Sequence, residues 1–275
     1  MTARAPVQPL RDRDFIFEYA RQAPLALALE RAMECRLLAD YALERPVLDV
    51  GCGDGRFVEI LYGTASGIDY GLDADPAETA RAARRNVYAS VLTASATAIP
   101  LPDASIATVI SNSTLEHIHP LQEVLAEVAR VLRQGGTLLI TVPTDRFDHY
   151  PVIYRVLHGL GLDGAAERFR SFYDRFWHHY HFYRPEVWRT TLEGCGLRVD
   201  EIAEYDSAAR CAAHDALVPL ALPAFLAKRF FDRYVLFPRL RAAAIRIIRP
   251  LLPLDRTDRL PSGRGGLVFL RASKP

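Results

Sequence analysis

The sequence lacks the features that would assign it to several specialised classes of protein. Its four cysteines, Cys35, Cys52, Cys195 and Cys211, are widely spaced, and no pair has metal-ligand spacing or suggests a disulfide framework. The longest uncharged apolar run considered, residues 216–227, contains two prolines. Its twelve residues are too few for a membrane-spanning helix. The N-terminus has no apolar segment typical of a signal peptide. These absences predict a cytoplasmic protein.

No charge of one sign dominates the chain. The formal net charge of the 275 residues is +1, so no general attraction to nucleic acid is expected. With 50% hydrophobic and 24% charged residues, the composition is that of an ordinary globular protein and excludes a disordered or fibrous one. The charge is unevenly distributed, because residues 225–264 contain ten Lys or Arg against three Asp or Glu. A local excess of this size can mark a contact with an anionic partner.

Bulky apolar residues alternate with the basic ones in this segment. They include Phe230, Phe231, Phe237, Ile247 and Ile248. One interpretation is that residues 225–254 lie on an anionic membrane surface or hold an amphiphilic substrate, giving a peripheral membrane contact. The other is a buried helical cap whose arginines face water. In either case the prolines are expected to prevent one long spanning helix.

What the sequence does contain is a regular alternation of helix and strand signals. Residues 15–43 read as one or two helices, and an apolar stripe at helical spacing predicts a helix over 121–132 that ends at Gly135-Gly136. Further helices are predicted at 56–62, 75–86 and 185–195, and strands at 46–51, 66–73, 87–93, 106–111, 137–142, from 196 and at 265–271. Such alternation predicts an α/β protein with a mainly parallel sheet covered on both faces.

The strongest chemical signal is the run Val47-Leu48-Asp49-Val50-Gly51-Cys52-Gly53-Asp54-Gly55, in which a strand enters a glycine-dense turn before a helix. Glycine permits positive φ and close approach of a ligand to the main chain, and the helix then presents free N–H groups. Asp73 lies 22 residues after Gly51, at the end of the next strand, where an acid can bind ribose hydroxyls. The alternative is a tight turn without a ligand.

This pattern departs from the dinucleotide fingerprint, because Arg56 occupies its sixth position. It resembles motif I of the class I S-adenosylmethionine (SAM)-dependent methyltransferases, and the type 11 small-molecule subgroup in particular. The segments 71–76, 95–103, 109–118 and 121–143 resemble the corresponding family segments, so the likeness covers residues 45–143. The resemblance implies a Rossmann-like methyltransferase fold with a seven-stranded, mostly parallel sheet, helices on both faces and an antiparallel last strand.

The resemblance also implies the residues that bind SAM. Asp49 would support the turn and the amino group, Asp73 would hold the ribose, and the remaining cofactor-binding residues would be Gly51, Gly53, Gly55, Ala96, Thr97 and Asn112. Ser95 stands where the family usually has an acid that bonds the adenine amino group.

Methyl transfer from SAM requires alignment and water exclusion and sometimes a base, since SAM is an activated donor. His117 follows the fourth strand and is the candidate catalytic base; a packing or capping role is the alternative. The histidines of residues 177–183 could ligate metal, but no carboxylate or cysteine joins them at a familiar spacing, so no metal site is predicted. The segment is expected to pack over the site, as a lid or as a simple amphipathic cover.

The predicted organisation is an N-terminal helical segment, residues 1–44, and a SAM-dependent methyltransferase domain, residues 45–275. Its mainly helical cap comes from two insertions, 144–184 and 205–264. The predicted function is methyl transfer from SAM to a small-molecule or lipid-like acceptor. The alternatives are a non-catalytic SAM-binding protein and an NAD(P)-dependent oxidoreductase.

Overall fold

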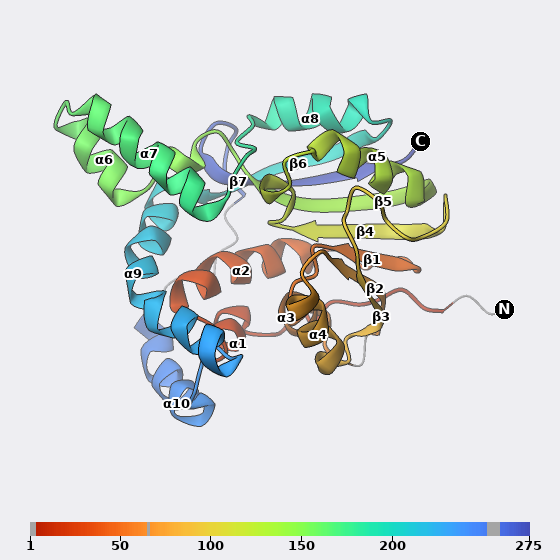
Figure 1. Ribbon diagram of the computed structural model, residues 1–275, viewed down its shortest axis with the longest axis horizontal. Coiled ribbons are helices and arrows are strands. Elements are labelled where there is room, and N and C mark those ends of the chain that lie inside the picture. The colour runs from red at the N-terminus through yellow and green to blue at the C-terminus, as the bar shows by residue number, and fades with distance from the viewer. Residues whose placement is uncertain (1–3, 65–66, 252–258) are drawn as a thin grey trace.

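The computed structural model describes residues 4–64, 67–251 and 259–275, and it contains the expected α/β architecture (Figure 1). Seven strands form one sheet in the order β3-β2-β1-β4-β5-β7-β6. β1 to β5 run parallel, whereas β7 is antiparallel to both β5 and β6. The strands are β1 (Val47–Val50), β2 (Ile68–Asp73), β3 (Tyr88–Thr93), β4 (Ile106–Asn112), β5 (Leu132–Pro143), β6 (Arg198–Ser207) and β7 (Gly265–Ser273).

Helices cover both faces of the sheet because successive strand residues point to opposite faces. Val47 and Ile110 pack with α1 (Phe15–Ala20), α2 (Leu25–Leu38), α3 (Arg56–Tyr62) and α4 (Pro76–Arg85). The adjacent residues Leu48 and Val109 pack on the other face with α5 (Leu121–Val131) and α8 (Pro185–Gly194). The sequence prediction of a two-sided, mostly parallel sheet is confirmed.

Local signals place most helix ends correctly. The Asp75 side chain accepts a hydrogen bond from the Ala77 amide at 2.7 Å, and Pro76 follows in the first helical position. One boundary was predicted wrongly: Gly135 and Gly136 lie inside β5, and α5 ends at Val131. These glycines pair with the C-terminal end of the chain, since the Gly135 amide donates to the Lys274 carbonyl at 2.8 Å.

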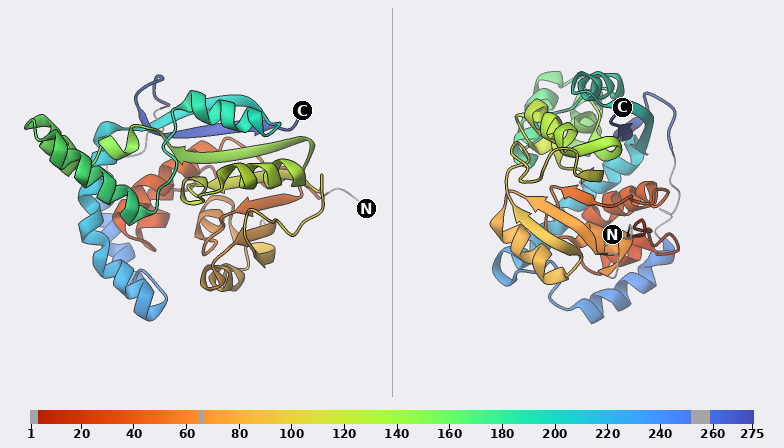
Figure 2. Two further views of the ribbon diagram at one scale, coloured as in Figure 1. Left: turned by 45° about the horizontal axis from the view of Figure 1, so that its top comes forward. Right: turned by 90° about the vertical axis from the view of Figure 1, so that its right-hand side faces the viewer.

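Both insertions contain helices. The first forms α6 (Val152–Gly159) and α7 (Asp163–Trp177), and the second forms α9 (Ala208–Phe231) and α10 (Pro238–Ile248). Figures 1 and 2 show both helix pairs at the same end of the sheet, with α6 and α7 projecting away from the body. Residues 252–258, which the sequence analysis placed in the second insertion, lie outside the described residues, as do Ser66 and residues 1–3.

The sequence analysis took residues 216–227, with their two prolines, as too short for a membrane-spanning helix; this is wrong, because α9 continues for 24 residues through Pro219 and Pro223. Within residues 225–254 the helix does break as expected, since α9 ends at Phe231 and α10 begins at Pro238. A proline has no N–H group, so one carbonyl of the preceding turn loses its helical hydrogen-bond partner. That carbonyl is tolerated where water can bond to it instead. Only 17% of the most apolar part of α9 is buried. Among the described residues, α9 is the one helix whose length and composition would allow it to span a membrane.

Candidate functional site

The site lies at the carboxyl ends of the parallel strands. The strand order reverses between β1 and β4, and ligands of open α/β sheets bind at such a switch point. A cavity of about 310 Å³ opens there, which we call the turn cavity. Its walls include Asp49, Gly51 and Gly53 from the β1 end and Asn112 from the β4 end.

The glycine turn forms the floor of the turn cavity. Gly51 has φ +76°, and a Cβ atom there would lie 2.1 Å from the Thr114 side chain, so no other residue fits. Gly53 also has positive φ, +51°, but a Cβ atom there would have no neighbour within 4 Å. The space over Gly53 is therefore open to a ligand, which is what close approach of a cofactor to the backbone requires.

One carboxylate bonds this turn, and a second lies buried at its start. Asp73 accepts a hydrogen bond from the Gly53 amide through Oδ2 and one from the Asp75 amide through Oδ1, both at 2.9 Å. Asp49 is buried and accepts a hydrogen bond from the Tyr88 hydroxyl at 2.6 Å. Burial raises the pKa of Asp49 to about 7.

Asn112 is held by a buried carboxylate that the sequence analysis missed. Glu34 of α2 accepts hydrogen bonds from Asn112 Nδ2 at 2.7 Å and from the Ser113 hydroxyl at 2.5 Å, and Arg31 pairs with it at 2.8 Å. The side-chain oxygen Oδ1 of Asn112 accepts a hydrogen bond from the Thr141 hydroxyl of β5 at 2.9 Å. The N-terminal helical segment therefore builds part of the site. The available signal was a Glu-Arg-x-x-Glu pattern on an otherwise alanine- and leucine-rich helix.

A second cavity, of about 190 Å³, adjoins the first, and we call it the cap cavity. The two share Leu27, Arg31, Ser113 and Tyr234 in their walls. Apolar and aromatic side chains from both insertions enclose the cap cavity; they include Phe147, Tyr173, Trp177, Val218, Ala221 and Phe225. The expected cover over the site is therefore formed by side chains from both cap segments.

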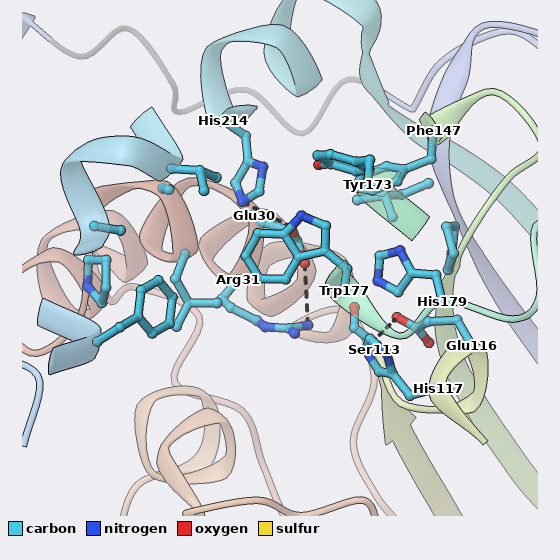
Figure 3. A pocket seen from close by; sticks show the side chains of 18 of the residues that line it. Glu30, Arg31, Ser113, Glu116, His117, Phe147, Tyr173, Trp177, His179 and His214 are labelled. Atoms are coloured by element: carbon cyan, nitrogen blue, oxygen red, sulfur yellow. Dashed lines mark ion pairs between the residues drawn. The ribbon is translucent and has the colours of Figure 1, made fainter. Parts of the chain in front are cut away.

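Polar groups of the cap cavity stand on two walls (Figure 3). On the first wall, Glu30 Oε1 lies 3.6 Å from Arg31 Nη1, and Glu30 Oε2 lies 3.5 Å from Nε2 of His214 in α9. Burial opposes ionisation of Glu30, but these two neighbours hold its pKa below the ordinary value. The facing wall carries Glu116, His117 and His179, which point toward one another. Burial raises the pKa of Glu116 to about 8 and lowers that of His179 to about 3.

The C-terminal end of α9 closes the turn cavity from the other side. Lys228 donates to Glu78 of α4 at 2.7 Å, and its ammonium lies 4.9 Å from the centre of the Tyr234 ring. Asp232 pairs with Arg81 and with Arg84 of the same helix. Glu78, in the first turn of α4, thus contacts the second insertion.

The structure brings only some of the sequence-predicted residues into these cavities. Asp49, Gly51, Gly53 and Asn112 line the turn cavity, and His117 lines the cap cavity. The others lie beside them: Gly55 is packed against Tyr88, Asp73 reaches the turn through the Gly53 amide, and Ala96 and Thr97 follow β3 without lining either cavity. The SAM-binding roles of all these residues stay predictions.

The sheet order and the open glycine turn together define a Rossmann-like α/β protein of the methyltransferase type. Comparison with known proteins gives the same class. The methyltransferase domain family model matches residues 48–140. A probable SAM-dependent methyltransferase from Mycolicibacterium smegmatis is 33% identical over 106 residues, 38% of this chain and 41% of the relative.

Two further comparisons extend over more of the chain. A fatty-acid O-methyltransferase from Mycolicibacterium smegmatis is 30% identical over 189 residues, 62% of this chain and 67% of that protein. The crystal structure of a possible histamine N-methyltransferase from Thermotoga maritima superposes with a TM-score of 0.55 at 15% identity, covering 91% of this chain and 92% of that one. The chain belongs to the class I SAM-dependent methyltransferases, a family of enzymes whose methyl donor is SAM.

Family membership confirms the resemblance noted in the sequence and discards the oxidoreductase alternative. The match covers only part of some relatives. The chain spans about two fifths of the length of the probable SAM-dependent methyltransferases from Mycolicibacterium smegmatis and Mycobacterium tuberculosis that it matches.

Proposed function

We propose that this protein transfers the methyl group of SAM to an oxygen atom of a lipid-like small molecule. The observation that carries the proposal is the contact between the two cavities. The turn cavity has the open glycine floor and the cap cavity has apolar and aromatic walls, and they meet at Leu27, Arg31, Ser113 and Tyr234. A donor in the first cavity and an apolar acceptor in the second would therefore face each other.

Two further observations support a lipid-like acceptor. Both cap insertions expose large apolar side chains to solvent, among them Leu160, Phe172, Phe230 and Phe237. Surfaces that receive amphiphilic ligands, partners or membranes expose large apolar side chains. A relative from Mycolicibacterium smegmatis that matches 62% of this chain is named a fatty-acid O-methyltransferase.

The chain's contribution to the reaction is positioning and water exclusion. When bound, SAM supplies an activated methyl group, so the protein need not generate a reactive species. Alignment of donor and acceptor can lower the barrier by roughly 7–11 kcal/mol. We propose His117 as the base that removes the proton of a hydroxyl acceptor. Its Nδ1 lies 3.2 Å from the His178 carbonyl, an arrangement that leaves the Nε2 lone pair free.

The proposal is tested by incubating the purified chain with methyl-labelled SAM and a panel of long-chain carboxylic acids, long-chain alcohols and polar amines, followed by mass spectrometry. We expect label in an ester or ether of an apolar acceptor and none in the amines. Labelled amines would contradict the acceptor class. Tight SAM binding with no turnover on the panel or on a cell extract would support the non-catalytic alternative instead.

We further propose that the basic segment, residues 225–254, attaches the enzyme to anionic membranes at their surface. Phe230, Phe231, Phe237 and Ile247 are exposed, as are Arg229, Arg233 and Arg239 close to them in the sequence. Ile248 is partly buried and packs against the core, so it is not part of this surface. Residues 252–254 lie outside the described residues. The exposed aromatic residues favour the surface interpretation over a fully buried cap.

Co-sedimentation with vesicles tests this attachment. Each basic residue near an anionic surface contributes about 1 kcal/mol, and salt screens exposed charges beyond about 8 Å at physiological ionic strength. We expect binding to phosphatidylglycerol vesicles at low salt, weaker binding at high salt, and none to neutral vesicles. The double variant Phe230→Ser, Phe237→Ser should lose binding, whereas Val187→Ser, an exposed apolar position on α8, should not. Equal behaviour of all three proteins would rule the segment out.

A further inference from the structure

The cap cavity contains three metal-ligating side chains whose proximity the sequence does not reveal. Glu116 and His117 belong to the short helix after β4 (Leu115–His117), and His179 follows α7 some 60 residues later. One ligand atom from each lies within 4.8 Å of the other two. We propose that these three residues bind a divalent transition-metal ion, zinc being the simplest case, that contacts the acceptor. The inference rests on the proposed function for its acceptor.

Two of the three ligands have buried polar atoms without a hydrogen-bond partner. Glu116 is 3% exposed, and its Oε2 has no partner among the described residues. His179 Nδ1 is likewise buried and unpartnered in the described part of the chain. Leaving a buried acceptor unsatisfied costs about 1–3 kcal/mol, and more for a charged group. A cation between them would satisfy both groups at once.

The third ligand is oriented for the same purpose. His117 Nδ1 lies 3.2 Å from the His178 carbonyl oxygen, to which it donates when protonated there. Metal-binding histidines usually donate their second ring N–H to a carbonyl or carboxylate in this way. His117 Nε2 then carries the lone pair and lies 3.8 Å from Glu116 Oε1, so both atoms are available to one cation. Two ligands of a tetrahedral zinc ion are about 3.4 Å apart at normal bond lengths, so a small side-chain adjustment suffices.

The backbone keeps these elements together. The Tyr180 amide donates to the Glu116 carbonyl at 2.8 Å, and His181 Nε2 lies 2.9 Å from the Ile118 carbonyl. The His117 and His179 rings are 4.7 Å apart between centroids. Nearby Arg31 forms its ion pairs with Glu34 and Glu30 and not with Glu116.

Two imidazoles and one carboxylate form a ligand set that suits zinc and leaves a coordination position for substrate. The ion would hold an oxygen acceptor and stabilise its negative charge. A hydroxyl acceptor gives its proton to water, whereas a carboxylate is already anionic. The oxygen then forms its bond to the methyl carbon, and the carbon–sulfur bond breaks with its electron pair remaining on sulfur. With Nε2 engaged by the metal, His117 is not the base, so its two roles exclude each other.

The test uses the full chain without a polyhistidine tag, freed of metal by a chelator and titrated with Zn²⁺ by calorimetry. We expect one equivalent to bind. Glu116→Gln and His179→Ala should each weaken binding at least tenfold, because each removes one of three ligands. His119→Ala, an exposed histidine outside the cluster, should bind as the wild type does. Co²⁺ should give visible absorption bands in the wild type that both ligand variants lose.

Two outcomes would overturn the metal site: no stoichiometric binding, or equal affinity in the wild type and the ligand variants. SAM binding is measured on the same samples, and we expect it to be unchanged, which also shows that the variants are folded. If the metal-free enzyme methylates an apolar acceptor at the full rate, the metal proposal fails and the proposed function stands. If Zn²⁺ binds as expected but no acceptor is methylated, the proposed function fails and the metal site stands.

Discussion

Replacement of Gly53 by valine is expected to abolish SAM binding. The space above Gly53 is open, since a Cβ atom there would meet no protein atom within 4 Å, and a valine side chain would fill the volume assigned to the ligand. A branched side chain at φ +51° also strains the backbone by about 1–3 kcal/mol. Isothermal titration calorimetry with SAM and S-adenosylhomocysteine measures the effect, and we expect no detectable binding.

Backbone strain alone must be separated from loss of the site. Gly196, between α8 and β6, also has positive φ, +81°, and open space at its Cβ position. Gly196→Val should therefore lower the thermal unfolding temperature to a similar extent and still bind SAM. Wild-type affinity in Gly53→Val would mean that the glycine turn is not the cofactor site.

Replacement of His117 by alanine is expected to have the second largest effect, a loss of about 10²- to 10⁴-fold in turnover on the true acceptor. His117 lines the cap cavity and not the turn cavity, so the affinity for SAM should hardly change. Steady-state kinetics on the acceptor, together with calorimetry for SAM, gives both quantities.

The matched control is His119→Ala, two residues further along the chain. His119 is exposed, stacks edge-on against Tyr180 and lines neither cavity. It should retain wild-type turnover. A loss below tenfold in His117→Ala would exclude the base role, and Zn²⁺ titration of the same variant would then decide between a metal ligand and a packing residue.

The glycine turn, where we expect SAM to bind, is the part of this protein whose structure the local sequence predicts best. A strand, a glycine turn and a helix follow one another within a few residues, so their geometry depends on near neighbours and on the φ angles that only glycine adopts freely. The same holds for the start of α4, where Asp75 and Pro76 set the cap. The family resemblance over residues 45–143 rests on these local elements, and the methyltransferase family model matches the same region.

Sequence signals were misleading where a long-range contact outweighs a local preference. Gly135 and Gly136 would end an isolated helix, but pairing with Lys274 places them in β5. Pro219 should break an isolated helix, yet α9 continues through it. The inner face of α9 lines the cap cavity, and its outer face is in contact with water.

Only the tertiary structure groups the polar residues that line the cap cavity. Glu34 bonds Asn112 across 78 residues of sequence, and His179, near the end of the first insertion, lies close to Glu116. No spacing pattern encodes such pairs, because the separation along the chain is set by the intervening helices and not by the ligands. The sequence by itself determined the class of fold and the position of the glycine turn. Only the packing of α2, the β4 end and the two insertions brought together the charged groups that would act on the acceptor.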